Sequence, residues 1–235
     1  MIITQTPLRI SLLGGNTDFP KYFKKYGGAV LTTTIDKYIY CIVKNRFDKQ
    51  IWINYSKKEI VDNVEDIKHD LVREAMKLVG VKDSIEITFL SDIPSEGSGL
   101  GSSSAVTVGV LNALHNYTGH SVTARQLAEE ACEIEVDILK RPIGYQDQYA
   151  VAFGGFNLIE FGKEIIVEPK YMSNPDNLML FYTGQTRSAD AILSKMKLNK
   201  DILQKNKDLV YAAIKFHGSI GAFLDEYWQL KKQLN

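Results

Sequence analysis

The alternation of apolar and polar residues predicts several β-strands along the chain. Residues 1–13 and 29–55 are rich in Ile, Val, Thr, Tyr and Trp, and SIEITFLSDI at 84–93 alternates between apolar and polar positions. Such segments fit a pleated, half-buried surface and therefore favour strands. Shorter segments of the same character predict three further strands, at 156–161, 165–168 and 178–183.

Helical patterns alternate with these strands. Between the first two strand regions, TDFPKYFKKYGG predicts a short helix over 19–26, with Pro20 in its first turn and Gly27 at its end. A second helix is expected over 66–80. The tail from 188 to 235 is expected to be mostly helical.

Two long helices are predicted in the middle of the chain. Apolar residues recur at helical spacing from Val106 to Tyr117, and Gly119 suits the helix end. Thr123 and Gln126 have the spacing of a capping box, which predicts a helix over 124–139. The order of elements indicates an α+β fold.

A change in character near Pro169–Pro175 predicts a domain boundary. We expect a first domain over residues 1–172, which carries a mixed sheet. A partial, mostly helical second domain is expected over residues 173–235.

The segment GSGLGSSSA at 97–105 lies between a predicted strand and a predicted helix. Glycines let the backbone approach a ligand and adopt positive φ, and a helix N-terminus attracts anions. Serine hydroxyls can donate to phosphate oxygens or ligate Mg²⁺. The positions after Gly101 are serines, whereas a Walker loop carries a lysine there. The segment therefore predicts a phosphate-binding loop of another class, with an ordinary tight turn as the alternative.

Composition and charge narrow the range of partners. The chain has 235 residues, 45% of them hydrophobic, and equal totals of 28 basic and 28 acidic residues. This balance gives no reason to expect nucleic-acid or membrane binding, so an anionic ligand needs a local cluster of charge. The start MIITQTPLRI does not resemble a signal peptide, and no apolar run is long enough to span a membrane. Cys41 and Cys132 are expected as buried free thiols in a soluble, cytoplasmic protein.

Glu135 stands out on the helix predicted over 124–139. At about 100° per residue it shares a face with the apolar positions Leu127, Ala128, Ala131, Ile134 and Ile138. A carboxylate on a face that becomes buried needs a cationic partner. The sequence leaves two partners open: an arginine or lysine in a salt bridge, or a bound Mg²⁺.

Three further charged residues have ordinary structural interpretations from sequence alone. Asp147 follows Gly144 near a predicted helix start and can be an N-cap. Asp18 can cap the helix over 19–26, and Arg9 in its strand can lie at the surface.

Three motifs in order give the chain a family resemblance. They are TPLRISLLGGNTDF at 6–19, DIPSEGSGLGSSSA at 92–105 and EIEVDILKRPIGYQDQYAVAFGG at 133–155. Together they resemble the GHMP kinases, the family of galactokinase, homoserine kinase and mevalonate kinase. The resemblance implies a two-lobed fold, ATP as the phosphoryl donor and Mg²⁺ as its companion ion.

The resemblance also assigns roles to residues. It makes Asp147 the catalytic aspartate that accepts or orients the proton of the attacking sugar hydroxyl, with Arg9 paired to it. It assigns Mg²⁺ to Ser103 and Glu135. The ATP phosphates fall to the loop residues Gly97, Ser98, Gly99, Leu100, Gly101, Ser102, Ser103 and Ser104. The sugar falls to the segment Gly15, Asn16, Thr17 and Asp18.

Within the family, LLGGNTD and GYQDQYAVAFGGFN are most similar to the branch that phosphorylates the anomeric hydroxyl of D-glycero-D-manno-heptose 7-phosphate. A phosphorylated sugar needs a second cation, and Arg187 in TGQTRSAD is the candidate. The alternatives are a kinase for fucose or a related hexose, and a non-catalytic sugar or nucleotide sensor. The expected partners are small molecules, and the sequence does not indicate an oligomeric state.

The chain departs from the family pattern in two places. The phosphate loop carries one additional residue, assigned to Glu96. No segment after Gly155 matches the third glycine-rich motif of the family, a G-A-G-x-G-G-like sequence. The C-terminal lobe is therefore expected to be incomplete in this chain.

Overall fold

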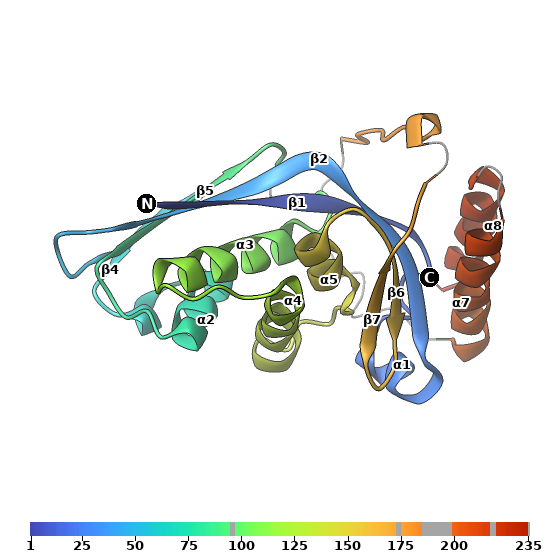
Figure 1. Ribbon diagram of the computed structural model, residues 1–235, viewed down its shortest axis with the longest axis horizontal. Helices are drawn as coiled ribbons and strands as arrows, with labels where there is room; N and C mark the ends of the chain where they lie inside the picture. The colour runs from blue at the N-terminus through green and yellow to red at the C-terminus, as the bar shows by residue number, and fades with distance from the viewer. Residues whose placement is uncertain (95–96, 173–174, 185–198, 217–219, 235) are drawn as a thin grey trace.

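A computed structural model describes residues 1–94, 97–172, 175–184, 199–216 and 220–234 (Figure 1). Within this part of the chain, seven strands form one mixed sheet in the order β4-β3-β5-β2-β6-β7, with β1 paired to β2. The pairing of β3 with β5 is parallel, and the other pairs are antiparallel. The strands are β1 (Ile2–Leu13), β2 (Gly28–Asn45), β3 (Ile51–Asn54), β4 (Lys58–Val61), β5 (Ile85–Ser91), β6 (Phe156–Phe161) and β7 (Ile165–Pro169).

The long strand β2 connects the two halves of the sheet. Residues 28–33 of β2 pair with β6, and residues 39–45 pair with β5. β1 runs antiparallel to β2 along most of its length, and Figure 1 shows β2 bending where it passes from one half to the other. The strands predicted at 1–13, 84–93, 156–161 and 165–168 are confirmed, and the region 29–55 divides into β2 and β3.

Helices pack on one face of the sheet (Figure 1). They are α2 (Asp70–Val79), α3 (Ser102–Tyr117), α4 (Ala124–Cys132) and α5 (Gln146–Phe153). The central helix α3 contacts both β1 and β2, and it buries Ala105, Val108, Leu111 and Leu114 in the main core. Since burial of an aliphatic side chain stabilises by about 1.5–3 kcal/mol, this packing fixes α3 and the loop before it on the sheet.

A short helix and a 3₁₀ turn complete the described part of the N-terminal region. α1 (Pro20–Tyr26) follows β1 as predicted, with Pro20 in its first turn and Gly27 at its end. Gly27 has a φ of 68°, which glycine adopts without strain. A 3₁₀ turn over Val64–Asp66 precedes α2, so the helix predicted over 66–80 begins later than expected.

The helix predicted over 124–139 is α-helical only as far as Cys132. The Thr123 hydroxyl accepts a hydrogen bond from the N–H of Gln126, as a capping residue should. From Glu133 to Ile138 the chain is a π-helix, whose i→i+5 hydrogen bonds change the side-chain period. The predicted apolar face therefore fails at its end, where Ile138 is 44% exposed.

The strand predicted at 178–183 is wrong. After β7, a 3₁₀ turn (Pro175–Asn177) leads into irregular chain, where Met179, Leu180, Phe181 and Tyr182 are largely exposed. Without a neighbouring strand their apolar pattern has no sheet to join.

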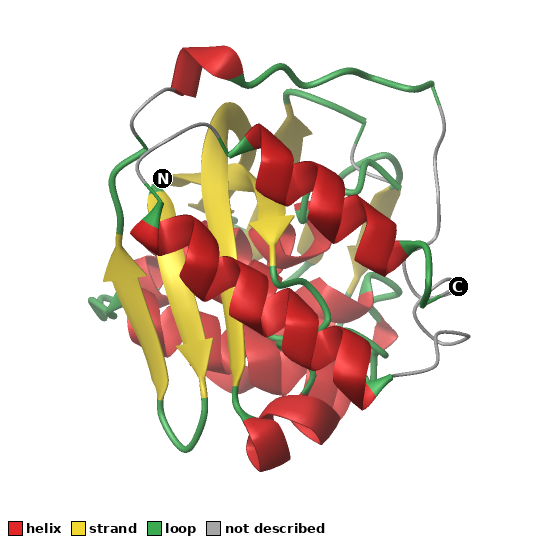
Figure 2. Cartoon of the chain, turned by 90° about the vertical axis from the view of Figure 1, so that its right-hand side faces the viewer, coloured by secondary structure: helices red, strands yellow, loops and turns green. Residues whose placement is uncertain are grey.

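The C-terminal helices α7 (Lys200–Lys215) and α8 (Gly221–Lys231) lie at one end of the sheet, and Figure 2 brings them to the front. Both contact β1, and α7 also contacts β2. The helical character expected of the tail is thus confirmed for the part of the tail that the structure describes. The division into domains 1–172 and 173–235 stays a prediction.

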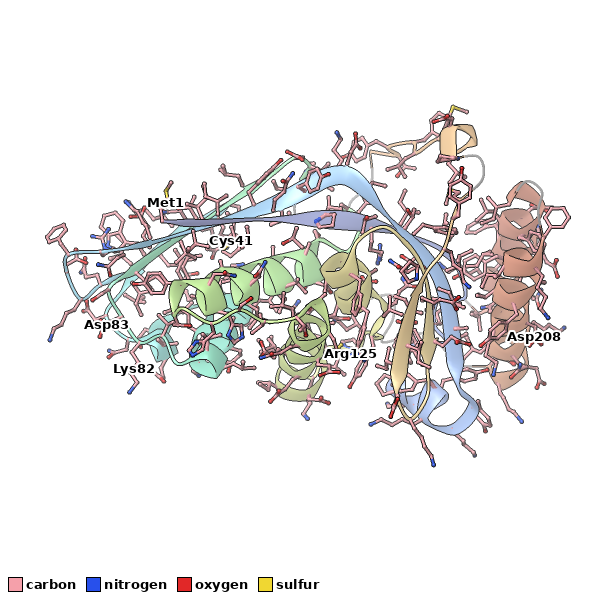
Figure 3. All side chains as sticks on the ribbon, in the orientation of Figure 1. Met1, Cys41, Lys82, Asp83, Arg125 and Asp208 are labelled. Atoms are coloured by element: carbon pink, nitrogen blue, oxygen red, sulfur yellow. The ribbon has the colours of Figure 1, made fainter. Side chains whose placement is uncertain are left out.

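Cys41 lies on β2 in the main core (Figure 3). Cys132 is the last residue of α4. Both are buried free thiols, as expected, and burial raises the pKa of each well above its ordinary value. Among the described residues, no helix combines the length and the apolar character needed to cross a membrane.

Candidate active site

The glycine-serine segment forms the turn between β5 and α3. Gly97, Gly99 and Gly101 have φ angles of 68°, 71° and 74°, a left-handed conformation that favours glycine. Gly101 immediately precedes α3, so the N-terminal N–H groups of that helix point toward the loop. This is the geometry of an anion-binding turn. The other positions expected to contact ATP lie in the same turn or in the first turn of α3: Ser98, Leu100, Ser102, Ser103 and Ser104.

Arg9 fastens this loop to β1. Its backbone N–H donates to the carbonyl of Leu100 at 2.9 Å, and its Nη1 donates to the carbonyl of Gly99 at 2.8 Å. A Cβ on Gly101 would lie only 3.0 Å from Cγ of Arg9, so the loop passes very close to the arginine stem. The β1–β2 register shifts between Pro7 and Arg9, and such irregularities re-aim side chains at functional sites.

The Arg9 guanidinium also pairs with Asp147. Nε donates to Oδ1 at 2.7 Å and Nη2 donates to Oδ2 at 2.5 Å, which is a bidentate arrangement. Asp147 lies in the first turn of α5, but the residue before the helix is Tyr145, so Asp147 is not the N-cap. The two motifs expected to act together are therefore in contact, with 28% of the Asp147 side chain still exposed.

Gln146 makes a further contact with the Asp147 carboxylate. Its Nε2 donates to Oδ1 of Asp147 at 3.3 Å, and its Oε1 accepts a hydrogen bond from the Ser11 hydroxyl at 2.9 Å. Gln146 is 5% exposed, so this arrangement is fixed inside the protein. The sequence pattern did not single out Gln146, and its only signal was its place beside Asp147.

Asp18 lies close to the same helix start. Its Oδ2 accepts a hydrogen bond from the N–H of Gln146 at 3.0 Å, so its carboxylate caps α5 and not α1. A Cβ on Gly144 would lie 1.9 Å from Oδ2 of Asp18, which leaves room only for glycine. Burial raises the pKa of Asp18 to about 6; the Gln146 N–H lowers it and the nearby Asp147 raises it.

The segment from Gly14 to Asp18 forms a tight loop between β1 and α1. Thr17 is fully buried, and its hydroxyl oxygen lies 2.7 and 2.9 Å from the carbonyl oxygens of Gly14 and Ala29, to either of which it can donate. The Thr17 hydroxyl thus shapes the loop, and the assignment of Thr17 to the sugar stays a prediction. Gly15 is buried, whereas Asn16 is partly exposed with a φ of 74°.

Glu135 is fully buried and faces the phosphate loop. The Ser103 hydroxyl donates to its Oε2 at 3.1 Å, and the Nη1 of Arg141 lies 3.9 Å from the same oxygen. Burial raises the pKa of Glu135 to about 7, while Arg141 and the hydroxyls of Ser103 and Ser104 lower it. The structure thus leaves both partners of Glu135 open. Arg141 lies beside the carboxylate, and the carboxylate and the Ser103 hydroxyl are oxygens of the kind that bind Mg²⁺.

Arg141 was not anticipated from the sequence. Its Nη1 donates to the Ser103 hydroxyl at 2.6 Å, and its Nη2 lies 3.0 Å from both carboxylate oxygens of Asp70. The guanidinium therefore links α2 to the first turn of α3, next to Glu135. Its only sequence signal was a position in LKRPIG between Glu135 and Asp147.

No group of three or more His, Cys, Asp or Glu side chains suited to a metal is found among the described residues. Ser103 and Glu135 are the pair that fits Mg²⁺, which is commonly bound through one or two protein ligands together with substrate phosphates. Arg187, the predicted second cation, and Glu96, the additional loop residue, lie outside the described residues.

Comparisons with known proteins agree on one family of kinases. A model of the GHMP kinases N terminal domain matches residues 53–155, which include the phosphate loop, Glu135 and Asp147. The D-glycero-alpha-D-manno-heptose 7-phosphate kinase of Campylobacter jejuni is 35% identical over 98% of this chain and 77% of its own length. The L-fucokinase/L-fucose-1-P guanylyltransferase of Bacteroides fragilis is 29% identical over 82% of this chain but only 25% of its own length.

A solved structure shares the fold. The crystal structure of a D-glycero-D-manno-heptose 1-phosphate kinase from Bacteroides thetaiotaomicron superimposes with a TM-score of 0.79 at 28% identity, over 99% of this chain and 80% of that one. Together with the 35% identical relative, this agreement extends over the N-terminal segment that carries Arg9 and Asp18. The chain therefore belongs to the GHMP kinase family.

Proposed function

We propose that the protein transfers the γ-phosphoryl group of ATP to the anomeric hydroxyl of a sugar phosphate. The substrate is D-glycero-D-manno-heptose 7-phosphate, and the product is the 1,7-bisphosphate. The observation that carries this proposal is the bidentate Arg9–Asp147 pair. Arg9 also binds the phosphate loop at Gly99. Asp147 lies in the first turn of α5, whose first residue Gln146 donates its N–H to Asp18.

In this proposal the loop from Gly97 to Ser104 wraps the triphosphate of ATP. Backbone N–H groups and the N-terminus of α3 supply hydrogen bonds to phosphate oxygens without a lysine in the loop. Arg9 contributes positive charge at the loop, since its Nη1 donates a hydrogen bond to the Gly99 carbonyl.

Asp147 acts on the attacking sugar hydroxyl. Its carboxylate is held by Arg9 and Gln146 and is partly exposed, so an incoming hydroxyl can donate to it. Phosphoryl transfer asks mainly for positioning and charge compensation, and an aspartate that orients the nucleophile meets the first requirement. The Arg9 guanidinium beside it meets the second.

Mg²⁺ fits the oxygens of Ser103 and Glu135, which would hold it beside the ATP phosphates. When bound, the ion supplies neutralisation of phosphate charge. The bond from Arg141 to Asp70 would keep the guanidinium beside this pair of oxygens.

Asp18, Gly15 and Asn16 form the sugar side of the site. The Asp18 carboxylate accepts from the sugar hydroxyls, and the partly exposed Asn16 lies at the loop surface. Two heptose phosphate kinases among the similar proteins support this sugar class. Arg187 stays a proposed contact to the sugar phosphate.

A kinase for L-fucose is the second candidate, favoured by the relative from Bacteroides fragilis, whose printed name includes L-fucokinase. For either sugar we propose a cytoplasmic location, where ATP is available. For the heptose we also propose a place in the supply of activated sugar for surface polysaccharide.

The experiment is ADP release measured with a panel of free and phosphorylated sugars. The proposal predicts turnover with D-glycero-D-manno-heptose 7-phosphate and none with L-fucose. Turnover only on unphosphorylated sugars would refute the assignment of a sugar phosphate as the substrate. Sugar binding without ADP release would favour a sensor.

A further inference from the structure

Helix α8 lies against the candidate sugar loop. Tyr227 is 6% exposed and packs with Leu12, Leu13 and Val210 in one apolar cluster. A Cβ on Gly15 would lie 2.5 Å from the Tyr227 hydroxyl oxygen, so this hydroxyl touches the loop directly. A residue from the C-terminal helices therefore forms part of the wall beside Gly15.

The Tyr227 hydroxyl donates no hydrogen bond to a described residue. The Gly15 backbone beside it acts on the phenol oxygen only as a donor, so the O–H itself is free to donate. Buried donors almost always have an acceptor, so a free O–H beside a binding loop points to a ligand. Burial raises the pKa of Tyr227 well above its ordinary value; Asp18 raises it further, and the Gly15 backbone and Arg9 lower it. The hydroxyl thus stays protonated and can donate to an incoming group.

Lys231 follows Tyr227 by four residues and shares its helix face. Its ammonium lies 5.3 Å from the centre of the Tyr227 ring. Burial lowers the pKa of Lys231, as does the positive charge of Arg9, whereas Asp18 raises it. Lys231 is therefore within electrostatic reach of both Arg9 and Asp18. Its ammonium lies among protein atoms, while the residue as a whole keeps access to solvent.

The charges around Lys231 leave it uncompensated. Arg9 is paired with Asp147, and Asp18 is engaged by the backbone of Gln146. Within the described chain, no carboxylate lies within ion-pair distance of the Lys231 ammonium. An accessible, unpaired cation beside a ligand loop attracts an anion.

The packing of α8 indicates which anion lies within reach of Lys231. Leu230 and Leu234 pack with Tyr22 of α1, and Tyr227 packs against Gly15, so α8 lies on the sugar-loop side of Arg9. The ATP phosphates are assigned to the opposite side, where Arg9 contacts Gly99.

We propose that Lys231 binds the phosphate group carried by the sugar substrate, and that the Tyr227 hydroxyl donates a hydrogen bond to the same substrate. This inference rests on the proposed function. It supplies, inside the described chain, the second cation that a phosphorylated sugar requires.

The test is calorimetric binding and steady-state kinetics of Lys231→Met, with Lys232→Met as the matched control. Lys232 is the next residue, and its ammonium lies 6.0 Å from the Trp228 ring centre. Lys231→Met should weaken binding of D-glycero-D-manno-heptose 7-phosphate by about 10- to 100-fold, the range expected for one charged hydrogen bond. Binding of the heptose without its phosphate, and of ATP, should change by less than about threefold.

Tyr227→Phe provides a second variant that keeps the buried ring. It should raise the KM for the sugar phosphate and leave the KM for ATP unchanged. Wild-type affinity of Lys231→Met for the sugar phosphate, or a loss of ATP affinity in its place, would overturn the inference. A wild-type protein that binds no sugar phosphate would refute the proposed function and the inference with it, and it is recognised before any variant is compared.

Discussion

The Arg9 guanidinium donates two hydrogen bonds to the Asp147 carboxylate and a third to the Gly99 carbonyl, and so joins three separate segments of the chain. Arg9 and Asp147 are 138 residues apart in sequence. The strand β1 and the helix α5 bring them together, and the phosphate loop is held at the same point. A single side chain thus sets both the position of the proposed base and the path of the loop.

Replacement of Arg9 by lysine keeps the charge and removes the fork of donors. We expect Arg9→Lys to lower kcat by about 10- to 100-fold, since a hydrogen bond to a charged group contributes about 1.5–3 kcal/mol. Steady-state kinetics with ATP and the sugar phosphate provide the measurement. Arg46→Lys is the matched control, because Arg46 forms a similar two-bonded pair with Asp48 away from the site. Equal losses in both variants would show that the effect is structural.

A methyl group at Gly144 should displace the Asp18 carboxylate. The Cβ would lie 1.9 Å from Oδ2, and the backbone at Gly144 has no positive φ that would itself resist alanine. Gly144→Ala is therefore expected to raise the KM for the sugar by about tenfold or more, the loss of one charged hydrogen bond. Gly162→Ala is the control, since its nearest contact would be an ordinary 3.6 Å. An unchanged KM for the sugar in Gly144→Ala would remove Asp18 from the sugar site.

The Asp18 carboxylate makes the protein less stable as the pH rises. Its pKa is about 6 in the folded protein against 3.8 for the ordinary side chain, so the folded state retains a proton that the unfolded state has released between these values. Stability therefore falls as the pH rises from about 4 to 6, by at most about 3 kcal/mol in total. Asp18→Asn keeps an acceptor for Gln146 and removes this penalty.

Urea unfolding at pH 4 and pH 8 measures the difference. The asparagine variant should be the more stable protein at pH 8, by about 1–3 kcal/mol, and should lose that advantage at pH 4. An equal advantage at both pH values would contradict the raised pKa of Asp18.

Glu135→Gln tests the proposed Mg²⁺ contact. The amide keeps the size of the side chain and loses the charge, so the concentration of Mg²⁺ needed for half-maximal nucleotide binding should rise about tenfold or more. Titration of Mg²⁺ into the protein with a non-hydrolysable ATP analogue reports this without turnover. Glu133→Gln lies on the same π-helix with its side chain exposed, and it should leave the Mg²⁺ dependence unchanged. The same Mg²⁺ dependence in both variants would contradict the Mg²⁺ contact and leave Arg141 as the cationic partner of Glu135.

The sequence predicted the elements whose information is local. The β-branched segments of β1 and β2 and the periodic helix α3 each carry their own pattern, and burial reinforces it. The strand expected at 178–183 failed because an apolar pattern forms a strand only where a neighbour offers hydrogen bonds. The π-helix after Cys132 has no sequence signature, since it arises from how the chain is packed.

Part of the candidate site was predictable because some of its residues lie in local sequence motifs. Arg9, Asp18, Glu135 and Asp147 lie in motifs, and the fold brings Arg9, Asp18 and Asp147 to one place. Residues that act through a partner, such as Gln146 and Arg141, could not be found, because their bonds to Asp147 and Ser103 exist only after folding. Tyr227 could not be found either, because the sequence around it does not indicate that its helix packs against Gly15.

The central claim is that Asp147 orients the attacking hydroxyl of a phosphorylated sugar, and the turnover of Asp147→Asn tests it most directly. The asparagine keeps the shape of the side chain but is a poor proton acceptor. The account predicts that kcat with D-glycero-D-manno-heptose 7-phosphate falls by about 100- to 10,000-fold, while ATP binding and the far-ultraviolet circular dichroism stay unchanged. Turnover near that of the wild-type protein, in a folded variant, would contradict it.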